Sequence, residues 1–316
     1  MFLVTGATGF IGTHVVEKLV ASGRPVRALV RRADRDWPCP TACCDLAAGA
    51  GLEDALDGVD AVIHLAGATK GLTPEDYYRA NVVASTNLAR ALAGRAIRLV
   101  HVSSLAAAGP NPDATPVTED AAPHPVSAYG RSKLAGERAV RGLKPDAVVV
   151  RPPVVYGPRD TGVFKLLKSV SRGWSLEIGG GERWFSSVYV ADLVDGLIRA
   201  ATEAPLGRTY YLAHPKPATW SSLAATAAGI MGVTLRVLRL PVSAAYAVGY
   251  CAEIWSQATR RASVISRDKI SEAQHQYWVC SPNRAAEELG WRAATSMEQG
   301  LDKTLAWYKE AGWIRY

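Results

Sequence analysis

A glycine-rich turn close to the start of the chain constrains its fold more than any other feature. Thr5-Gly6-Ala7-Thr8-Gly9-Phe10-Ile11-Gly12 lies between a short apolar run, typical of a buried strand, and a helical pattern over Phe10–Ala21. In this context Gly6 permits the turn, Gly9 lets the backbone approach a pyrophosphate, and Gly12 lets the helix pack closely on the sheet. The helix N-terminus also offers free N–H groups and a positive dipole end to phosphates. The turn therefore predicts a dinucleotide site, with a tight turn that binds nothing as the alternative.

The alternation of apolar runs and helical patterns continues through the first half of the chain. It predicts an α/β fold, a Rossmann doubly wound parallel sheet with helices on both faces. We expect strands at residues 2–5, 25–30, 61–65, 97–102 and 147–150, and helices at 10–21, 52–56, from 73 onward and 127–141.

Beyond residue 151 the strict alternation loosens, which predicts a second unit. We expect residues 1–155 to form the Rossmann dinucleotide-binding domain, with 188–202 returning to it. Residues 156–316 then form mostly a smaller C-terminal mixed α/β substrate-binding lobe. Within this lobe we expect strands at 210–213 and 235–240, and helices at 220–231, 242–259 and 297–311. The connection over 105–126 is long and rich in Pro, Ala and Asp, which is typical of a functional loop.

The residues after the second strand favour one nicotinamide cofactor over the other. An acidic residue there would bind the ribose 2′-hydroxyl of NAD, but this chain has Arg31 and Arg32. An arginine accommodates the 2′-phosphate of NADP, so the sequence favours NADP over NAD. Asp34 and Asp36 follow shortly afterwards and keep NAD open.

A serine, a tyrosine and a lysine indicate catalytic chemistry. Tyr129 and Lys133 are four residues apart on a predicted helix and share a face, where an ammonium would lower the pKa of the phenol. Ser103 and Ser104 end the preceding strand, at the edge of the sheet where α/β proteins bind ligands. An ordinary amphipathic-helix pair is the alternative, which the accompanying glycine turn disfavours.

The composition disfavours several other classes of protein. The net charge is +7, but the basic residues are scattered, so we expect no nucleic-acid partner. The 5 cysteines form no Cys-x-x-Cys pair, so free thiols in a reducing compartment and no metal site are expected. No stretch of about 18 apolar residues and no secretory signal occurs, which predicts no transmembrane segment and a cytoplasmic location. A small-molecule substrate is the expected partner, and a homodimer stays open.

Taken together, these motifs resemble the extended short-chain dehydrogenase/reductase family, the NAD(P)-dependent epimerases, dehydratases and dehydrogenases. The resemblance covers nearly the whole chain, from the glycine turn to the Val188-Tyr189-Val190-Ala191-Asp192-Leu193 element, and includes His64-Leu65-Ala66-Gly67 and Arg151-Pro152-Pro153-Val154. It implies a set of residues that bind the cofactor: Gly6, Thr8, Gly9, Phe10, Ile11, Gly12, Arg31, Arg32, Asp45, Leu46, Leu65, Ala66, Gly67, Asn81, Ser103, Tyr129, Lys133, Pro152 and Val154.

The resemblance also implies a mechanism. Tyr129 would exchange a proton with the substrate oxygen, and Ser104 would hold that oxygen. Lys133 would bind the nicotinamide ribose and lower the pKa of the tyrosine. The chain would thus be an NAD(P)-dependent oxidoreductase that works by hydride transfer.

Three features narrow the expected substrate. Leu105-Ala106-Ala107-Ala108 follows Ser104, where dehydratases of the family carry acidic residues. Pro241–Trp255 is a mostly apolar helical segment, with core packing or a lid as the alternative to a contact with substrate. The C-terminal lobe resembles those of the 3β-hydroxysteroid dehydrogenase-like and dihydroflavonol reductase-like members. An apolar, steroid- or flavonoid-like alcohol or ketone is therefore expected.

Two alternatives stay open. A sugar-nucleotide epimerase would need cations for the diphosphate, which Arg159, Arg172 and Arg183 could supply. A non-catalytic dinucleotide sensor or assembly subunit is disfavoured by the intact tyrosine–lysine pair.

Overall fold

The doubly wound parallel sheet is confirmed by the computed structural model, which describes residues 1–33, 36–241, 243–244 and 267–316. Seven strands lie in the order β11-β6-β5-β4-β1-β2-β3, and every neighbouring pair is parallel. Their bounds are β1 Phe2–Thr5, β2 Val26–Val30, β3 Thr41–Cys43, β4 Ala61–His64, β5 Arg98–Val102, β6 Val148–Val150 and β11 Thr209–Tyr210. The order reverses between β1 and β4, which is where such sheets bind dinucleotides.

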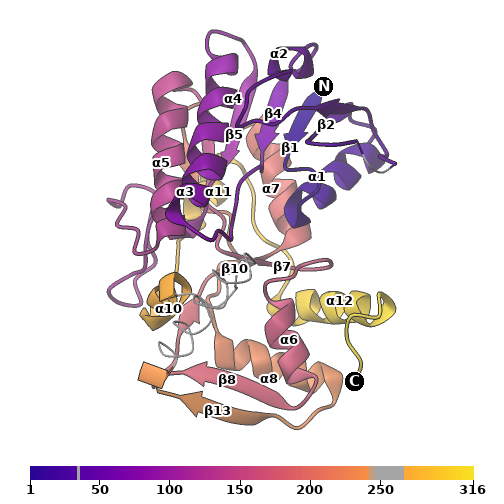
Figure 1. The fold of residues 1–316 in the computed structure, drawn as a ribbon. Helices are drawn as coiled ribbons and strands as arrows, with labels where there is room; N and C mark the ends of the chain where they lie inside the picture. Colours follow the sequence, from indigo (N-terminus) through magenta and orange to yellow (C-terminus); the bar gives the residue numbers. More distant parts are fainter. Residues whose placement is uncertain (34–35, 242, 245–266) are drawn as a thin grey trace.

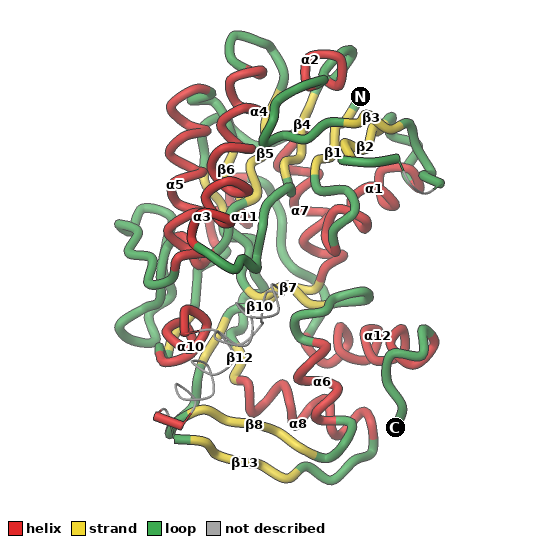
Figure 2. The backbone as a smooth tube through the Cα atoms, viewed as in Figure 1, coloured by secondary structure: helices red, strands yellow, loops and turns green. Residues whose placement is uncertain are grey.

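Helices cover both faces of this sheet (Figures 1 and 2). One face carries α1 (Phe10–Ala21) and α7 (Val190–Thr202), and the other carries α4 (Ala84–Leu92) and α5 (Ala128–Leu143). Successive residues of a strand therefore pack on opposite faces of the sheet. Ile63 packs with residues of α1 and α7, whereas its neighbour Val62 packs with residues of α4. Burial on both faces explains why the strands read as continuous apolar runs. A short helix, α2 (Leu52–Ala55), precedes β4.

The predicted long helix after Thr73 is present but is interrupted. Thr73 caps α3 (Pro74–Tyr78) through a capping box with Asp76. A π-helical turn, η1 (Arg79–Val83), then joins α3 to α4. Such turns mark functional sites in many proteins, and this one contains Asn81.

Beyond β6, apart from α7 and β11, the chain forms smaller sheets and further helices (Figure 1). β7 (Val154–Tyr156) pairs parallel with β10 (Ser187–Tyr189), and β8 (Trp174–Ile178) pairs parallel with β13 (Arg236–Leu240). β9 (Trp184–Phe185) lies between β12 (Ala218–Thr219) and β14 (Tyr277–Trp278). The helices are α6 Phe164–Val170, α8 Trp220–Met231, α10 Arg267–Gln274, α11 Asn283–Glu288 and α12 Met297–Glu310.

Two expectations for the second half need comment. The strand expected in the lobe at 210–213 instead joins the main sheet as β11 (Thr209–Tyr210), because it pairs with β6. The helix expected at 242–259 and most of the apolar segment Pro241–Trp255 lie outside the described residues. Within the described part of the chain, no helix is long and apolar enough to cross a membrane.

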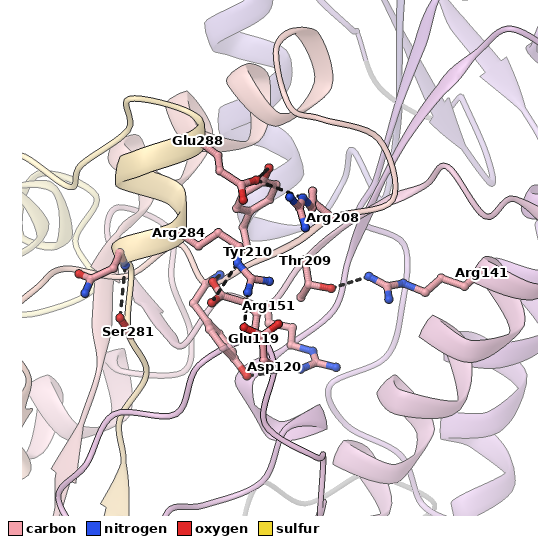
Figure 3. A network of polar contacts seen from close by, with 12 residues as sticks. Glu119, Asp120, Arg141, Arg151, Arg208, Thr209, Tyr210, Ser281, Arg284 and Glu288 are labelled. Carbon is pink, nitrogen blue, oxygen red and sulfur yellow. Dashed lines mark hydrogen bonds and ion pairs between the residues drawn. The ribbon is translucent and has the colours of Figure 1, made fainter.

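A polar network joins the long loop and the C-terminal segment to the end of the sheet (Figure 3). Glu119 of the loop accepts a hydrogen bond from the backbone N–H of Tyr211 and lies 3.8 Å from Arg284. In addition, Arg151 forms a buried two-pronged ion pair with Glu137 of α5, at 2.9 and 2.6 Å. The loop is further held by a backbone hydrogen bond from Asn111 to Tyr277. These contacts hold the two halves of the chain together beside the site described next.

Candidate active site

The glycine turn has the close backbone packing that a pyrophosphate cradle requires. Gly6 has a φ of +66°, and a Cβ there would lie 2.7 Å from the backbone nitrogen of Ala66. A Cβ on Gly12 would lie 2.2 Å from the carbonyl oxygen of Gly6, so only glycine lets α1 begin this close to the turn. Gly9 caps α1 without any side-chain hydrogen bond, which leaves the helix N–H groups directed at the space above it. The residues present thus fit a dinucleotide phosphate.

A cleft of about 370 Å³ opens beside this turn and reaches the region after β2. Thr8, Gly9, Phe10, Trp37 and Arg159 are among its lining residues. Arg159 makes an ion pair of 2.8 Å with Glu17 of α1, so its charge is directed at this cleft and not at a substrate cavity.

Arg31 and Arg32 follow the last residue of β2, and both are exposed. Asp34 lies outside the described residues, and Asp36 lines the cleft. Asp45 is exposed after β3 and accepts a hydrogen bond from the N–H of Ala47.

The loop after β4 is held in place by Asn81. The Asn81 side chain accepts a hydrogen bond from the N–H of Ala68 at 2.8 Å and donates to the carbonyl oxygen of the same residue at 3.0 Å. It also donates to the Ser132 hydroxyl at 2.9 Å, which connects the loop to α5. A Cβ on Gly67 would lie 2.6 Å from the Asn81 side-chain oxygen. Asn81 therefore positions the loop that contains Leu65, Ala66 and Gly67.

A buried hydrogen-bond chain joins this loop to the end of β1. The N–H of Ala66 donates to Thr5 Oγ1, which lies 2.7 Å from Nδ1 of His64. Nε2 of His64 lies 2.8 Å from Ser85 Oγ, and that hydroxyl donates to the carbonyl oxygen of Asn81. Because the Ser85 proton is committed, the ring must donate from Nε2 and accept at Nδ1. Burial lowers the pKa of His64 to about 3, so the ring stays neutral.

Ser104, Tyr129 and Lys133 come together at the carboxyl end of β5. Ser127 caps α5 by accepting a hydrogen bond from the N–H of Gly130, and this places Tyr129 in the first turn. The Ser104 hydroxyl hydrogen-bonds to the phenol oxygen of Tyr129. Lys133 is buried one turn further along and donates to the carbonyl oxygen of Val102 at 2.8 Å.

In the chain on its own the pKa of Tyr129 is raised, whereas the sequence predicts that Lys133 lowers it. Burial raises the pKa of Tyr129 to about 12, and the hydrogen bond from Ser104 offsets only part of this effect. Burial also lowers the pKa of Lys133 to about 8. Burial is the largest cause of both shifts.

A cavity of about 410 Å³ opens directly onto Ser104 and Tyr129. Its walls are largely aromatic and aliphatic. The apolar lining residues are Leu105, Ala106, Pro153, Val154, Leu166, Leu176, Trp184, Phe185, Trp220, Ala273 and Trp278. Phe185 and Trp220 stack with their ring centroids 4.2 Å apart. This shape and chemistry suit an apolar ring or chain.

Of the three arginines proposed to bind a diphosphate, only Arg183 lines this cavity. Its Nε donates to the carbonyl oxygen of Ala273 at 2.7 Å. Arg172 is exposed and is not among the lining residues. An acidic residue, Glu272, also reaches the cavity and accepts a hydrogen bond from Ser127 at 2.5 Å.

The aromatic walls were not found by sequence reasoning. Trp184 and Phe185 lie on β9, Trp220 starts α8 and Trp278 lies on β14, so they are far apart in sequence. The one available signal was the Trp-Phe pair just before the Val188 element, a dipeptide too short to show a periodicity.

Comparisons with known proteins agree with this geometry. The model of the NAD dependent epimerase/dehydratase family matches residues 2–213. The chain is 32% identical to the ceramide reductase of Caulobacter vibrioides, over 98% of this chain and 95% of that protein. It is 28% identical to the 4-hydroxy-2-methyl-3-oxo-4-farnesyl-3,4-dihydroquinoline-1-oxide ketoreductase of Stigmatella aurantiaca, over 95% and 94%. The structure of the Thermus thermophilus UDP-glucose 4-epimerase in complex with NAD is similar with a TM-score of 0.78 at 25% identity, over 98% and 99%.

Proposed function

This chain belongs to the NAD dependent epimerase/dehydratase family, and on that premise we propose that it interconverts an alcohol and a ketone on an apolar substrate, with NADP as the favoured cofactor. The chain is an enzyme of the extended short-chain dehydrogenase/reductase type. The observation that carries the proposal is the aromatic cavity that opens onto Tyr129 and Ser104.

The chemistry of the relatives supports this substrate class. The two relatives named above are a ceramide reductase and a ketoreductase whose substrate name includes a farnesyl group. Both names describe reduction, and both include a long apolar group. The apolar cavity of this chain could bury a group of that kind. Burying apolar surface contributes roughly 25 cal/mol per Å² to the free energy of binding.

The residues of the site have separate tasks in this proposal. The cofactor, when bound, supplies or accepts the hydride. Ser104 holds the substrate oxygen by a hydrogen bond, and Tyr129 donates its phenol proton to that oxygen as the alcohol forms. Lys133 binds the nicotinamide ribose. Burial raises the pKa of Tyr129 to about 12, so the phenol carries its proton at neutral pH and can donate it to the substrate oxygen.

A sugar-nucleotide epimerase is the second candidate. The observation in its favour is Arg183, which lines the cavity and could contact a phosphate. A diphosphate carries more than one negative charge, and Arg183 is the one arginine or lysine among the described lining residues. A buried diphosphate paired with a single arginine would be costly, so we favour the apolar alcohol or ketone.

The test compares ligands and one variant. In a thermal-shift panel with NADPH present, long-chain and ring ketones should stabilise the protein, while UDP- and TDP-sugars should not. A ligand at a hundredfold excess over its Kd adds about 2.7 kcal/mol to the free energy of unfolding. Tyr129→Phe should retain cofactor binding and lose nearly all turnover. A shift with a nucleotide sugar alone would favour the epimerase.

The cofactor preference is tested separately. Arg31→Ala should weaken NADPH binding and leave NADH binding unchanged, because the arginine faces only the 2′-phosphate in this proposal. Arg24→Ala, at the other end of β2, is the control and should change neither Kd. Equal NADPH affinity in Arg31→Ala and in the unsubstituted protein would remove Arg31 from the site.

A further inference from the structure

More than half of the exposed large apolar side chains lie on the elements that form the cavity or flank it. Eleven large hydrophobic side chains are exposed in the described part of the chain, and six of them lie on β8, β9, α8 and β13 of the lobe. We call these six residues the rim patch: Trp174, Leu176, Trp184, Trp220, Val237 and Leu238. Leu176, Trp184 and Trp220 also line the cavity, so the patch is continuous with it.

The ribbon of β8 and β13 presents much of this patch. It lies at the end of the molecule away from the main sheet, below α6 and α8 in Figure 1. Trp174 pairs with Arg236 and Leu176 pairs with Leu238, and alternate residues of paired strands share a face. Trp174, Leu176 and Leu238 are 46%, 50% and 51% exposed. Val237 pairs with Ser175 and lies on the other face of the ribbon, so the face that continues from the cavity mouth carries Trp174, Leu176 and Leu238. Exposed apolar surface that adjoins a cavity is typical of an interaction site.

The segments that contain β8, β9 and β13 carry a net positive charge. Residues 165–184 and 233–241 carry six basic and two acidic side chains. Arg236 lies over the Trp174 ring, with its guanidinium carbon 5.6 Å from the ring centroid. Tryptophan and leucine beside arginine and lysine are the composition that anchors proteins at the surface of anionic bilayers.

We infer that the rim patch docks the protein on an anionic lipid bilayer, with the cavity mouth facing the membrane. An apolar substrate would then enter the cavity from the bilayer without crossing water. The entry route rests on the proposed function, but the docking itself does not. A second copy of the chain fits this surface less well, because two patches of the same charge would repel each other.

The test measures binding to vesicles without cofactor or substrate. The full-length protein should float with vesicles of phosphatidylcholine and phosphatidylglycerol and remain largely unbound with phosphatidylcholine alone. Trp174→Ser combined with Leu238→Ser should lower vesicle binding about tenfold, since about half of each side chain is available for burial. Neither residue lines the cavity, so reduction of a water-soluble ketone should be unchanged.

Two matched controls separate the patch from general hydrophobicity and charge. Leu206→Ser removes a leucine that is 53% exposed outside the patch and should leave vesicle binding intact. Arg236→Glu should weaken binding about tenfold and lose this effect at high salt. Arg24→Glu is the matched control, because Arg24 lies over the Phe2 ring much as Arg236 lies over the Trp174 ring. Since Arg24 is outside the rim patch, this substitution should weaken vesicle binding far less.

The possible results distinguish the two proposals. Equal loss of binding in the patch variants and in their controls would overturn the docking inference. The inference would also be overturned if the unsubstituted protein did not bind vesicles and a patch variant converted a dimer to a monomer. The patch would then be an interface between copies of the chain. Vesicle binding without ketone reduction would leave the docking inference standing and defeat the proposed function.

Discussion

Two glycines of α5 should respond in opposite ways to replacement by alanine. A Cβ on Gly130 would lie 2.3 Å from the carbonyl oxygen of Ala106, whereas a Cβ on Gly142 would meet nothing within 4 Å. Gly130 packs the start of α5 on η2 (Leu105–Ala107), the turn that Ser104 caps. The same substitution on one helix therefore tests whether close packing at the site is required.

The magnitudes follow from these distances. Ordinary contact begins near 3.4 Å, so Gly130→Ala must move α5 and the turn apart by roughly 1 Å. The strain should destabilise the protein by about 1–3 kcal/mol and offset the gain in helix propensity. Gly142→Ala should stabilise it by about 0.5–1 kcal/mol, because alanine loses less backbone entropy. Since Tyr129 and Ser104 flank the contact, kcat of Gly130→Ala should fall about a hundredfold.

Urea unfolding measures the first effect and steady-state reduction of a ketone measures the second. Gly142→Ala should keep its kcat and shift its midpoint to higher urea. The reasoning fails if Gly130→Ala is as active and as stable as Gly142→Ala. A Gly130→Ala protein that is destabilised but fully active would show that the packing matters for the fold alone.

Three further results are expected. Glu137→Ala should lower the free energy of unfolding by about 3–5 kcal/mol, because it leaves the Arg151 guanidinium buried and unpaired. The double variant Glu137→Leu/Arg151→Met removes both charges and should recover most of this loss, as measured by urea unfolding. Gly12→Ala should abolish cofactor binding in a fluorescence titration, because the new Cβ meets the carbonyl oxygen of Gly6 at 2.2 Å. The stability of the unsubstituted protein relative to Lys133→Met should rise by about 1–2 kcal/mol from pH 8 to 9.5. Burial lowers the pKa of Lys133 in the folded protein to about 8, from 10.5 for the unfolded chain. Between these two pH values the folded lysine has lost its proton and the unfolded lysine has kept it, so raising the pH favours the folded state. A flat or falling stability difference in urea unfolding would contradict this.

Local pattern was sufficient wherever a single segment decided the structure. The strand at Phe2–Thr5 and the helices at Phe10–Ala21 and Trp220–Met231 have the predicted bounds, because periodicity and flanking glycines act within one segment. The glycine turn, the serine at the end of β5 and the tyrosine–lysine spacing likewise identified the family from short motifs. Their roles in binding and catalysis stay predictions.

Features that depend on contacts between distant segments could not be read in this way. β11 joins the sheet because β6 has a free edge, and nothing in residues 209–213 specifies that partner. The cavity walls come from β9, α8 and β14, which only the folded chain brings together. The sequence alone determined that a phenol and an ammonium share one helix face. The tertiary structure decided their pKa values, because desolvation, the largest cause of both shifts, depends on everything packed around a group.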